Sequence, residues 1–214
     1  HTRLRTVTRV QTCALPIYPP VTWLIAGLGN PGEDYADTRH NVGAMVVEDL
    51  AARAGSRLRS QGSVPVDLAE FHEGDERVLL IRSQRYMNES GPSIVGVARK
   101  HDVPAERIDC VHDELDLVLG ALQVRIGGGS AGHNGVKSLT SALGTPEFLR
   151  VRCGIGRPPG RQDPADFVLE PFRTAERDVA MELVDDAADA VLTLVRDGIA
   201  RAQDRYNRSG PRGA

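Results

Sequence analysis

The chain has 214 residues, of which 41% are hydrophobic and 26% charged, the composition of one soluble globular domain. No apolar run approaches the roughly 18 residues that a membrane-spanning helix needs, which excludes an integral membrane protein of that kind. The formal net charge of −3 excludes a strong overall attraction to nucleic acid. Any contact with RNA must therefore come from a local basic patch.

The beginning of the chain differs from the rest in character. Residues 1–20 are basic, show no amphipathic period and lack the apolar region and cleavage site of a secretory signal. Within them, Val10–Ile17 (VQTCALPI) resembles the translation of a sequencing adaptor fused upstream of an open reading frame. We therefore expect residues 1–20 to be a non-native or disordered extension, 21–208 to form one domain, and 209–214 to be a flexible tail.

Regular structure is predicted from Val21 onward. Residues 21–29 are an apolar run that ends in glycines, which indicates a buried strand leading into a turn. A polar loop, 30–40, precedes apolar residues at helical spacing over 42–50, with Gly55 as the stop signal. Two strands, 64–72 and 77–83, flank Glu-Gly-Asp and predict a hairpin.

The middle of the chain continues with alternating strand and helix signals. A loop over 86–88 precedes a helix predicted for 92–100, with proline in its first turn. Strands are predicted for 108–113 and 121–126. The glycine-rich run 127–132 is typical of a flexible loop.

The last third adds a helix, a strand and a long helix. Apolar residues at helical spacing over 136–143 predict a helix, and 148–156 a further strand. The Pro/Gly-rich segment 157–164 has few side chains to bury, so we expect a mobile loop. A long helix is predicted from Thr174, with an apolar stripe over 179–194. Alternating strands and helices predict a single three-layer α/β domain, with a mixed, mostly parallel twisted sheet flanked by helices.

The run Gly27–Gly32 matches the G-x-G-x-x-G pattern of dinucleotide-binding proteins. That function needs a helix that begins inside the motif, so that its N-terminal amides meet the pyrophosphate. Here the helical period begins only at Val42, and the acidic residues about 20 positions on, Glu48 and Asp49, lie within that helix. The sequence therefore disfavours a dinucleotide-dependent oxidoreductase, which remains the weaker alternative.

Polar side chains gather at predicted strand ends and in the loops beyond them, where α/β sheets carry their active sites. This set comprises Asn30, His40, Asn88, Asp113, His133 and Asn134. There is no G-x-S-x-G motif, and neither central cysteine neighbours a histidine in sequence. A histidine, a carboxylate and three amides suit activation of a water molecule and binding of an oxyanion. Taken singly, Asn30 is also consistent with a turn and Asn134 with a helix cap.

Metal and disulfide sites are not indicated. The three cysteines are scattered, without a CxxC pair: Cys13, Cys110 and Cys153. We expect them to be inert thiols of a reducing compartment. The acidic residues Asp113, Glu114 and Asp116 have no further ligand cluster nearby in sequence, so we expect neither a metal nor a cofactor.

Four motifs in order resemble those of the bacterial peptidyl-tRNA hydrolase family, over essentially all of Val21–Asn207. They are GLGNPGEDYADTRHNVG, YMNESG, HDELDL and GGGSAGHNGVKSL, followed by FLRVRCGIGRP. The resemblance implies a monomeric, metal-independent, cytoplasmic α/β esterase. Such an enzyme cleaves the ester between an N-blocked peptide and the 3′ end of tRNA, and so recycles tRNA from prematurely released peptidyl-tRNA.

The resemblance also implies roles for individual residues. His40 matches the catalytic base and Asp113 its carboxylate partner, while Asn30 and Asn134 match residues that hold the water or the oxyanion. The implied substrate-binding residues are Asn88, Met87, Tyr86, His133 and Tyr35. The implied tRNA contacts are Arg125 and Arg152, which would hold the single-stranded 3′ end and the acceptor stem.

One alternative within the same fold remains open at this point: an RNA-binding relative without hydrolytic activity. The joint presence of His40, Asp113 and the three asparagines argues against it, because a silent scaffold has no chemical need for the whole set.

Overall fold

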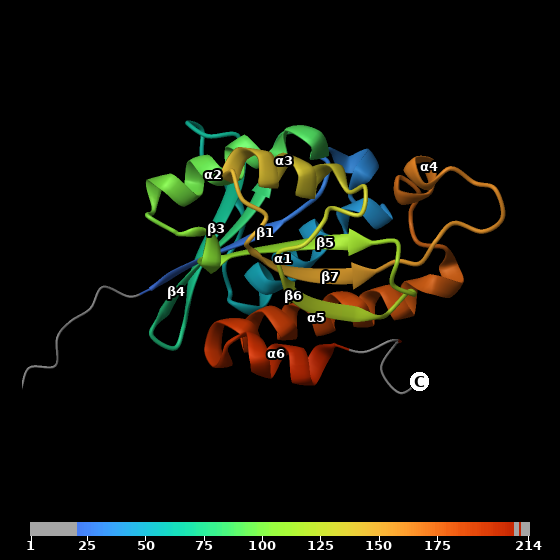
Figure 1. The fold of residues 1–214 in the computed structure, drawn as a ribbon. Coiled ribbons are helices and arrows are strands. Elements are labelled where there is room, and N and C mark those ends of the chain that lie inside the picture. Colours follow the sequence, from blue (N-terminus) through green and yellow to red (C-terminus); the bar gives the residue numbers. More distant parts are fainter. Residues whose placement is uncertain (1–20, 208–209, 211–214) are drawn as a thin grey trace, which may run out of the picture.

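The structure is a computed structural model that describes residues 21–207 and 210 (Figure 1). The predictions for residues 1–20 and for the tail 209–214, apart from Gly210, lie outside the described residues. The strands are β1 (Thr22–Gly27), β2 (Arg59–Ser60), β3 (Val66–Glu73), β4 (Glu76–Ser83), β5 (Ile108–Glu114), β6 (Leu122–Ile126) and β7 (Leu149–Gly154). The α-helices are α1 (Val42–Arg53), α2 (Ser90–Lys100), α3 (Asn134–Leu143), α4 (Pro164–Val168), α5 (Arg177–Asp197) and α6 (Ile199–Tyr206).

All seven strands form one sheet in the order β2-β3-β4-β1-β5-β7-β6. The four central strands, β4, β1, β5 and β7, run parallel, whereas β3 and β6 are antiparallel to their neighbours. Helices α2 and α3 cover one face and α1, α5 and α6 the other (Figure 1). The predicted three-layer α/β fold with a mixed sheet is confirmed. None of the helices within residues 21–207 is long and apolar enough to cross a membrane.

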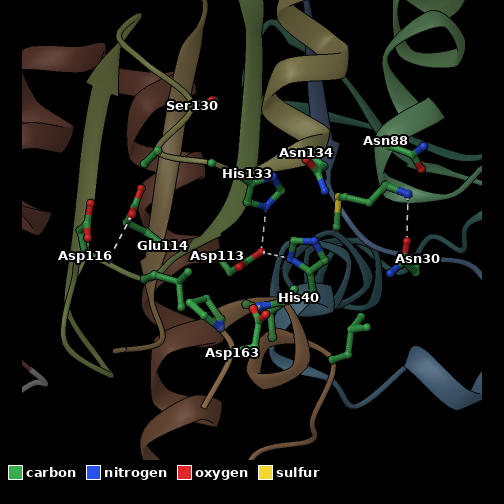
Figure 2. Close-up of a pocket in the computed structure, with 18 of the residues that line it drawn as sticks. Asn30, His40, Asn88, Asp113, Glu114, Asp116, Ser130, His133, Asn134 and Asp163 are labelled. Carbon is green, nitrogen blue, oxygen red and sulfur yellow. Dashed lines mark hydrogen bonds and ion pairs between the residues drawn. The ribbon is translucent and has the colours of Figure 1, made fainter. Parts of the chain in front are cut away.

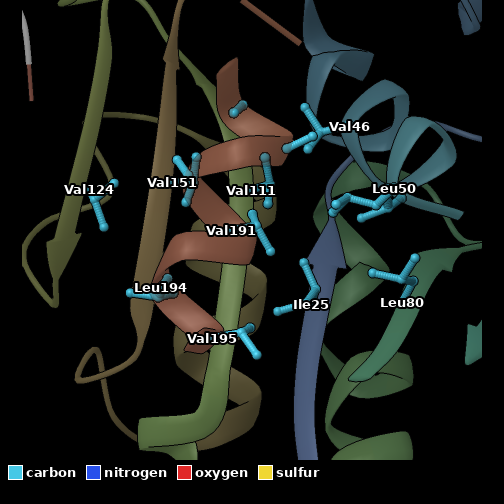
Figure 3. Close-up of a cluster of buried hydrophobic side chains, with 14 of the residues drawn as sticks. Ile25, Val46, Leu50, Leu80, Val111, Val124, Val151, Val191, Leu194 and Val195 are labelled. Carbon is cyan, nitrogen blue, oxygen red and sulfur yellow. The ribbon is translucent and has the colours of Figure 1, made fainter. Parts of the chain in front are cut away.

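Two apolar cores lie on the two faces of the sheet because strand side chains alternate. Ile25 and Val111 pack against α1 and α5, as Figure 3 shows for the larger core. Leu24 and Cys110 point the opposite way, into the core beneath α2 and α3. Burying one such aliphatic side chain contributes about 2 kcal/mol, so the central strands are held firmly from both sides.

The structure departs from the predicted elements in three places. The short edge strand β2 was not predicted, since two exposed residues carry no period. The long helix predicted from Thr174 is found as a 3-10 turn followed by α5, which ends at Gly198 with a φ of 81°, and the separate helix α6 after it was not predicted. Helix α4 starts where the predicted loop 157–164 ends, and it was missed because five residues show no helical pattern.

The glycines of the first motif bring α1 against the sheet. A Cβ atom on Gly27 would collide with the carbonyl oxygen of Gly43, and one on Gly43 with that of Val111 in the middle of β5. The amide of Ala44 donates to the carbonyl of Leu28 over 3.0 Å. The glycine pattern therefore serves helix packing here. It places His40, which lies in the 3-10 turn two residues before α1, beside the carboxyl end of β5.

Candidate active site

A cavity of about 600 Å³ opens at the carboxyl ends of β1, β4 and β5 (Figure 2). Asn30 follows β1, Asn88 follows β4 and Asp113 lies near the end of β5. The structure brings most of the predicted residues together in its lining: Asn30, His40, Tyr86, Met87, Asn88, Asp113, His133 and Asn134. Parallel strands deliver these side chains to one edge of the sheet, as expected for this class of fold.

His40 and Asp113 are hydrogen-bonded at the centre of this cavity. The Nδ1 atom of His40 lies 2.8 Å from Oδ1 of Asp113, and the two side chains are 12% and 3% exposed. A carboxylate can only accept, so Nδ1 of His40 carries the proton and Nε2 has a free lone pair. The imidazole is therefore held in the form that can remove a proton from water.

His133 binds the same carboxylate oxygen from the other side. Its Nε2 lies 2.8 Å from Oδ1 of Asp113. Its Nδ1 caps α3 by accepting from the amides of Gly135 and Val136, at 3.1 and 3.3 Å. Since Nδ1 accepts, the ring proton must be on Nε2, directed at Asp113. The interpretation of Asn134 as the cap of this helix is wrong: His133 is the cap, and Asn134 is the first helical residue.

These two histidines decide the charge of Asp113. Burial alone would raise the pKa of this carboxyl group, but His133 and His40 outweigh burial and lower the pKa below its usual range. A third ring, His112, is completely buried and stacks edge-on against His133 at 4.9 Å. Burial and the neighbouring His133 lower the pKa of His112 to about 3, so His112 stays neutral. Asp113 is thus an anion with two dedicated donors.

The first asparagine is held by a small network. The Oδ1 atom of Asn30 accepts from the backbone amide of Met87 at 2.8 Å, which ties the loop after β1 to the loop after β4. Asn41 binds the backbone of Asn30 twice, through Oδ1 at 2.8 Å and Nδ2 at 2.9 Å. With its oxygen engaged, Asn30 offers only its Nδ2 group to a bound molecule.

The remaining predicted substrate residues lie around the rim. The side chains of Asn88 and Asn134 are exposed and line the cavity (Figure 2). Tyr86 is also exposed and lines it, with Tyr35 packed edge-on against its ring at 6.4 Å. Tyr35 is not among the cavity-lining residues, so it would meet a substrate only through Tyr86. Met87 is buried beneath them.

The two predicted tRNA contacts lie outside the cavity, on the antiparallel strands β6 and β7. Arg125 pairs in register with Arg150, and Arg152 with Gln123, so all four project from the α3 face of the sheet. Nε and Nη2 of Arg152 bind Oε2 of the buried Glu114 at 3.1 and 2.6 Å. Glu114 therefore largely neutralises Arg152, whereas Arg125 has no ion pair among the described residues.

The cluster of His40, Asp113 and His133 also has the composition of a metal site, since their nearest ligand atoms all lie within 4.8 Å of one another. A metal would need the lone pair of Nε2 of His133. The cap of α3 puts a proton on that atom, so the cluster fits hydrogen bonding better than metal binding.

Sequence reasoning missed one wall of the cavity. Residues 163–172, called here the α4 wall, contribute Asp163, Pro164, Ala165, Val168 and Leu169 to the lining. It also missed Arg39, which directly precedes His40 in sequence. This arginine is fully buried and donates hydrogen bonds to the α4 wall. The only available signal was the position of Arg39 within the motif that contains His40.

Comparisons with known proteins agree with this geometry. The family model described as peptidyl-tRNA hydrolase matches residues 24–212. The chain is similar to the peptidyl-tRNA hydrolases of Frankia casuarinae, at 51% identity over 86% of this chain and 93% of that one, and of Arthrobacter, at 47% over 87% and 96%. The crystal structure of peptidyl-tRNA hydrolase from Acinetobacter baumannii superposes with a TM-score of 0.83, at 34% identity over 89% of this chain and 96% of that one. The chain belongs to the peptidyl-tRNA hydrolase family, as its sequence motifs predicted.

Proposed function

We propose that this chain hydrolyses the ester between a peptide and the 3′ end of tRNA, with His40 as general base. The observation that carries this proposal is the hydrogen bond from His40 Nδ1 to an ionised Asp113, which leaves Nε2 free in the cavity. Family membership supports the same reaction. The chemistry requires no cofactor, because an ester needs only an activated water and a stabilised oxyanion.

The reaction follows from these positions. Nε2 of His40 takes a proton from water while the water oxygen attacks the ester carbonyl carbon. Asp113 stabilises the imidazolium that forms, as the aspartate does in a serine-protease triad, with water in place of serine. The tetrahedral intermediate then expels the ribose oxygen, which receives the proton from His40. The products are a peptide carboxylate and a tRNA with a free terminal hydroxyl group.

Amide groups supply the remaining interactions. Asn134, at the N-terminus of α3, and Nδ2 of Asn30 are the donors assigned to the oxyanion or the water. One such donor typically contributes about 10²–10³ in rate. Asn88 would bind the peptide main chain, so recognition would tolerate any peptide sequence. We also assign His133 to hold Asp113, because both its ring nitrogens are engaged within the protein, while its predicted part in substrate binding stays a prediction, since it lines the cavity.

Arg125 and Arg152 are proposed to bind tRNA phosphates beside the cavity. The ion pair of Arg152 with Glu114 makes Arg125 the stronger contributor. Each phosphate contact adds about −0.7 to the slope of log affinity against log salt for a single strand. We expect Arg125→Ala to lower the magnitude of this slope by more than Arg152→Ala does. A slope that is unchanged in both variants would exclude this surface as the tRNA contact.

The decisive test is hydrolysis of N-acetylated aminoacyl-tRNA by the wild type, His40→Ala and the control His72→Ala. His72 is exposed on β3 and does not line the cavity. We expect His40→Ala to lower kcat by about 10²–10⁴ and His72→Ala to leave it unchanged. An aminoacyl-tRNA with a free amine should be a poor substrate for all three. A His40→Ala rate within a few-fold of wild type would refute the role of His40 as general base. Binding of tRNA without cleavage by the wild type would refute the proposed hydrolase activity.

We also propose that the protein acts as a monomer in the cytoplasm, where peptidyl-tRNA is produced. The two buried free thiols, Cys110 and Cys153, are compatible with a reducing compartment. Sedimentation of the purified chain at micromolar concentration tests the oligomeric state.

A further inference from the structure

Arg39 is the largest completely buried side chain among the described residues, and it adjoins the catalytic histidine in sequence. A buried guanidinium is costly unless its charge and donors are satisfied. Nη2 of Arg39 binds Oε2 of Glu176 at 2.6 Å, and its plane lies over the ring of Phe167 at 4.2 Å. Its surroundings therefore supply an anion, backbone acceptors and an aromatic face, while its Nε has no hydrogen-bond partner in the part of the chain that the structure describes.

The partners of Arg39 lie in and next to the α4 wall. Nη1 donates to the carbonyls of Glu170 and Pro171 at 3.1 and 2.8 Å, and the backbone amide of Arg39 donates to Glu170 as well. Glu176 caps the following helix by accepting from the amide of Arg173 at 2.7 Å. The side chain of Arg39 thus holds the C-terminal end of the α4 wall and the turn that begins α5.

The α4 wall has little internal structure to hold it in place. Helix α4 comprises only five residues, capped by Asp163, and its apolar contacts form a small separate cluster around Phe167 and Phe172. Yet this wall faces the reaction site: Figure 2 shows Asp163 on the opposite side of His40 from Asn134. The width of the cavity therefore depends on how firmly the wall is held.

We propose that Arg39 is a positioning residue that clamps the α4 wall and so sets the width of the substrate cavity. The inference rests on the proposed function for its kinetic consequence. It predicts an effect on substrate binding more than on chemistry, because His40 is held independently. Asp113 binds its ring, and the neighbouring Asn41 is locked to the backbone of Asn30. Without the clamp the wall would shift while the base stays in place.

Arg150 provides a matched control for the loss of a buried arginine. It is 2% exposed, lies over Phe148 at 4.7 Å, and donates to the carbonyls of Gly128 and Gly129, each at 2.8 Å. It therefore clamps another loop of the cavity by the same chemistry. Replacing Arg150 should loosen residues 127–132 and leave the α4 wall unchanged, which separates a local clamp from general destabilisation.

The test compares wild type, Arg39→Met, Arg39→Lys and Arg150→Met by amide hydrogen exchange and by kinetics on N-acetylated aminoacyl-tRNA. In Arg39→Met we expect exchange of residues 163–173 to rise about tenfold or more, while residues 127–132 keep their protection. KM should rise about tenfold and kcat change less than about threefold. Arg39→Lys keeps the positive charge but lacks the planar guanidinium group with its several donors. This variant should fold and show smaller increases in amide exchange and in KM.

Two results would overturn the proposal. Unchanged exchange of residues 163–173 in both Arg39 variants would show that Arg39 does not hold the wall. A loss in kcat with constant KM would show that Arg39 acts through His40 instead. The exchange measurement needs no activity, so the clamp remains testable if the wild type fails to hydrolyse the substrate, an outcome that would refute the proposed function alone.

Discussion

The two ends of strand β5 carry the same residue in opposite electrostatic states. Asp109 and Asp113 lie four positions apart, so both project from the same face of the strand, and both are buried. Burial raises the pKa of Asp109 to about 7. The backbone amide of Val151 lowers the pKa and offsets only part of this rise. At Asp113 two histidines reverse the direction.

The difference shows that partners, rather than burial or strand position, make a carboxylate useful for catalysis. Both groups lose contact with water, which favours the neutral acid. Only Asp113 gains two ring N–H donors, from residues that precede α1 and α3 on opposite faces of the sheet (Figure 1). The site therefore depends on the convergence of three elements at one oxygen atom.

The largest loss of activity is expected from removing the charge of Asp113, because this removes the difference between the two ends of β5. In Asp113→Asn the side chain has no negative charge to stabilise the imidazolium, and with its N–H group turned towards His40 it favours a His40 with the proton on Nε2. We expect the single-turnover rate on N-acetylated aminoacyl-tRNA to fall by about 10³–10⁴. The matched control is Asp109→Asn, which should keep kcat within a few-fold. Equal losses in both variants would mean that β5 packing, and not the charge, was disturbed.

A smaller effect is expected from variants of His133 that distinguish its hydrogen bond to Asp113 from its role as the cap of α3. His133→Asn keeps a good helix cap but is too short to reach Asp113, whereas His133→Ala loses both bonds. We expect kcat to fall about 10- to 100-fold in both variants, because one of the two donors to Asp113 is gone. Thermal unfolding should show a further loss of about 1 kcal/mol in the alanine variant only. Equal stability of the two variants would contradict the cap, and an unchanged kcat in His133→Asn would contradict the bond to Asp113.

The other end of β5 gives a prediction on stability against pH. The folded-state pKa of Asp109 lies above its ordinary value, so between about pH 4 and pH 7 the native state binds more protons than the unfolded state. This contribution is complete at pH 4 and is lost as the pH rises through 7. Asp109→Asn cannot titrate, so its free energy of unfolding relative to wild type should rise by an amount on the order of 4 kcal/mol from pH 4 to pH 8. Denaturant unfolding at both pH values measures it, and a pH-independent difference would show that Asp109 is ionised in the core.

The parts of the fold that could be predicted are the helices and strands whose apolar residues repeat at regular spacing along the chain. The run before Gly27 identified β1, and the stripe from Val179 to Leu194 identified α5, because their burial repeats along the chain. Helix α4 could not be found this way, since its Phe167 is held by tertiary contacts with Arg39 and with the apolar cluster around Phe172. Helix α6 was not predicted either, because only eight residues follow the break at Gly198.

The candidate site shows the same division. The family motifs contain its catalytic residues, and they lie together as strand-end residues should. Which atom bonds to which was not predictable. His133 lines the cavity, but the orientation of its ring by the first amides of α3 depends on the exact start of that helix. The ion pair of Arg152 with Glu114 likewise needs two neighbouring strands in register.

The contact of Gly27 and Gly43 has a consequence for how this protein tolerates change. Apolar side chains elsewhere in α1 can adapt to substitutions by choosing other rotamers, and the helix could drift by fractions of an ångström as they do. Backbone atoms in direct contact have no rotamers, so this one crossing acts as a fixed pivot. His40 sits within a few residues of that pivot. The core can therefore vary over generations of mutations while the spacing between His40 and Asp113 stays the same.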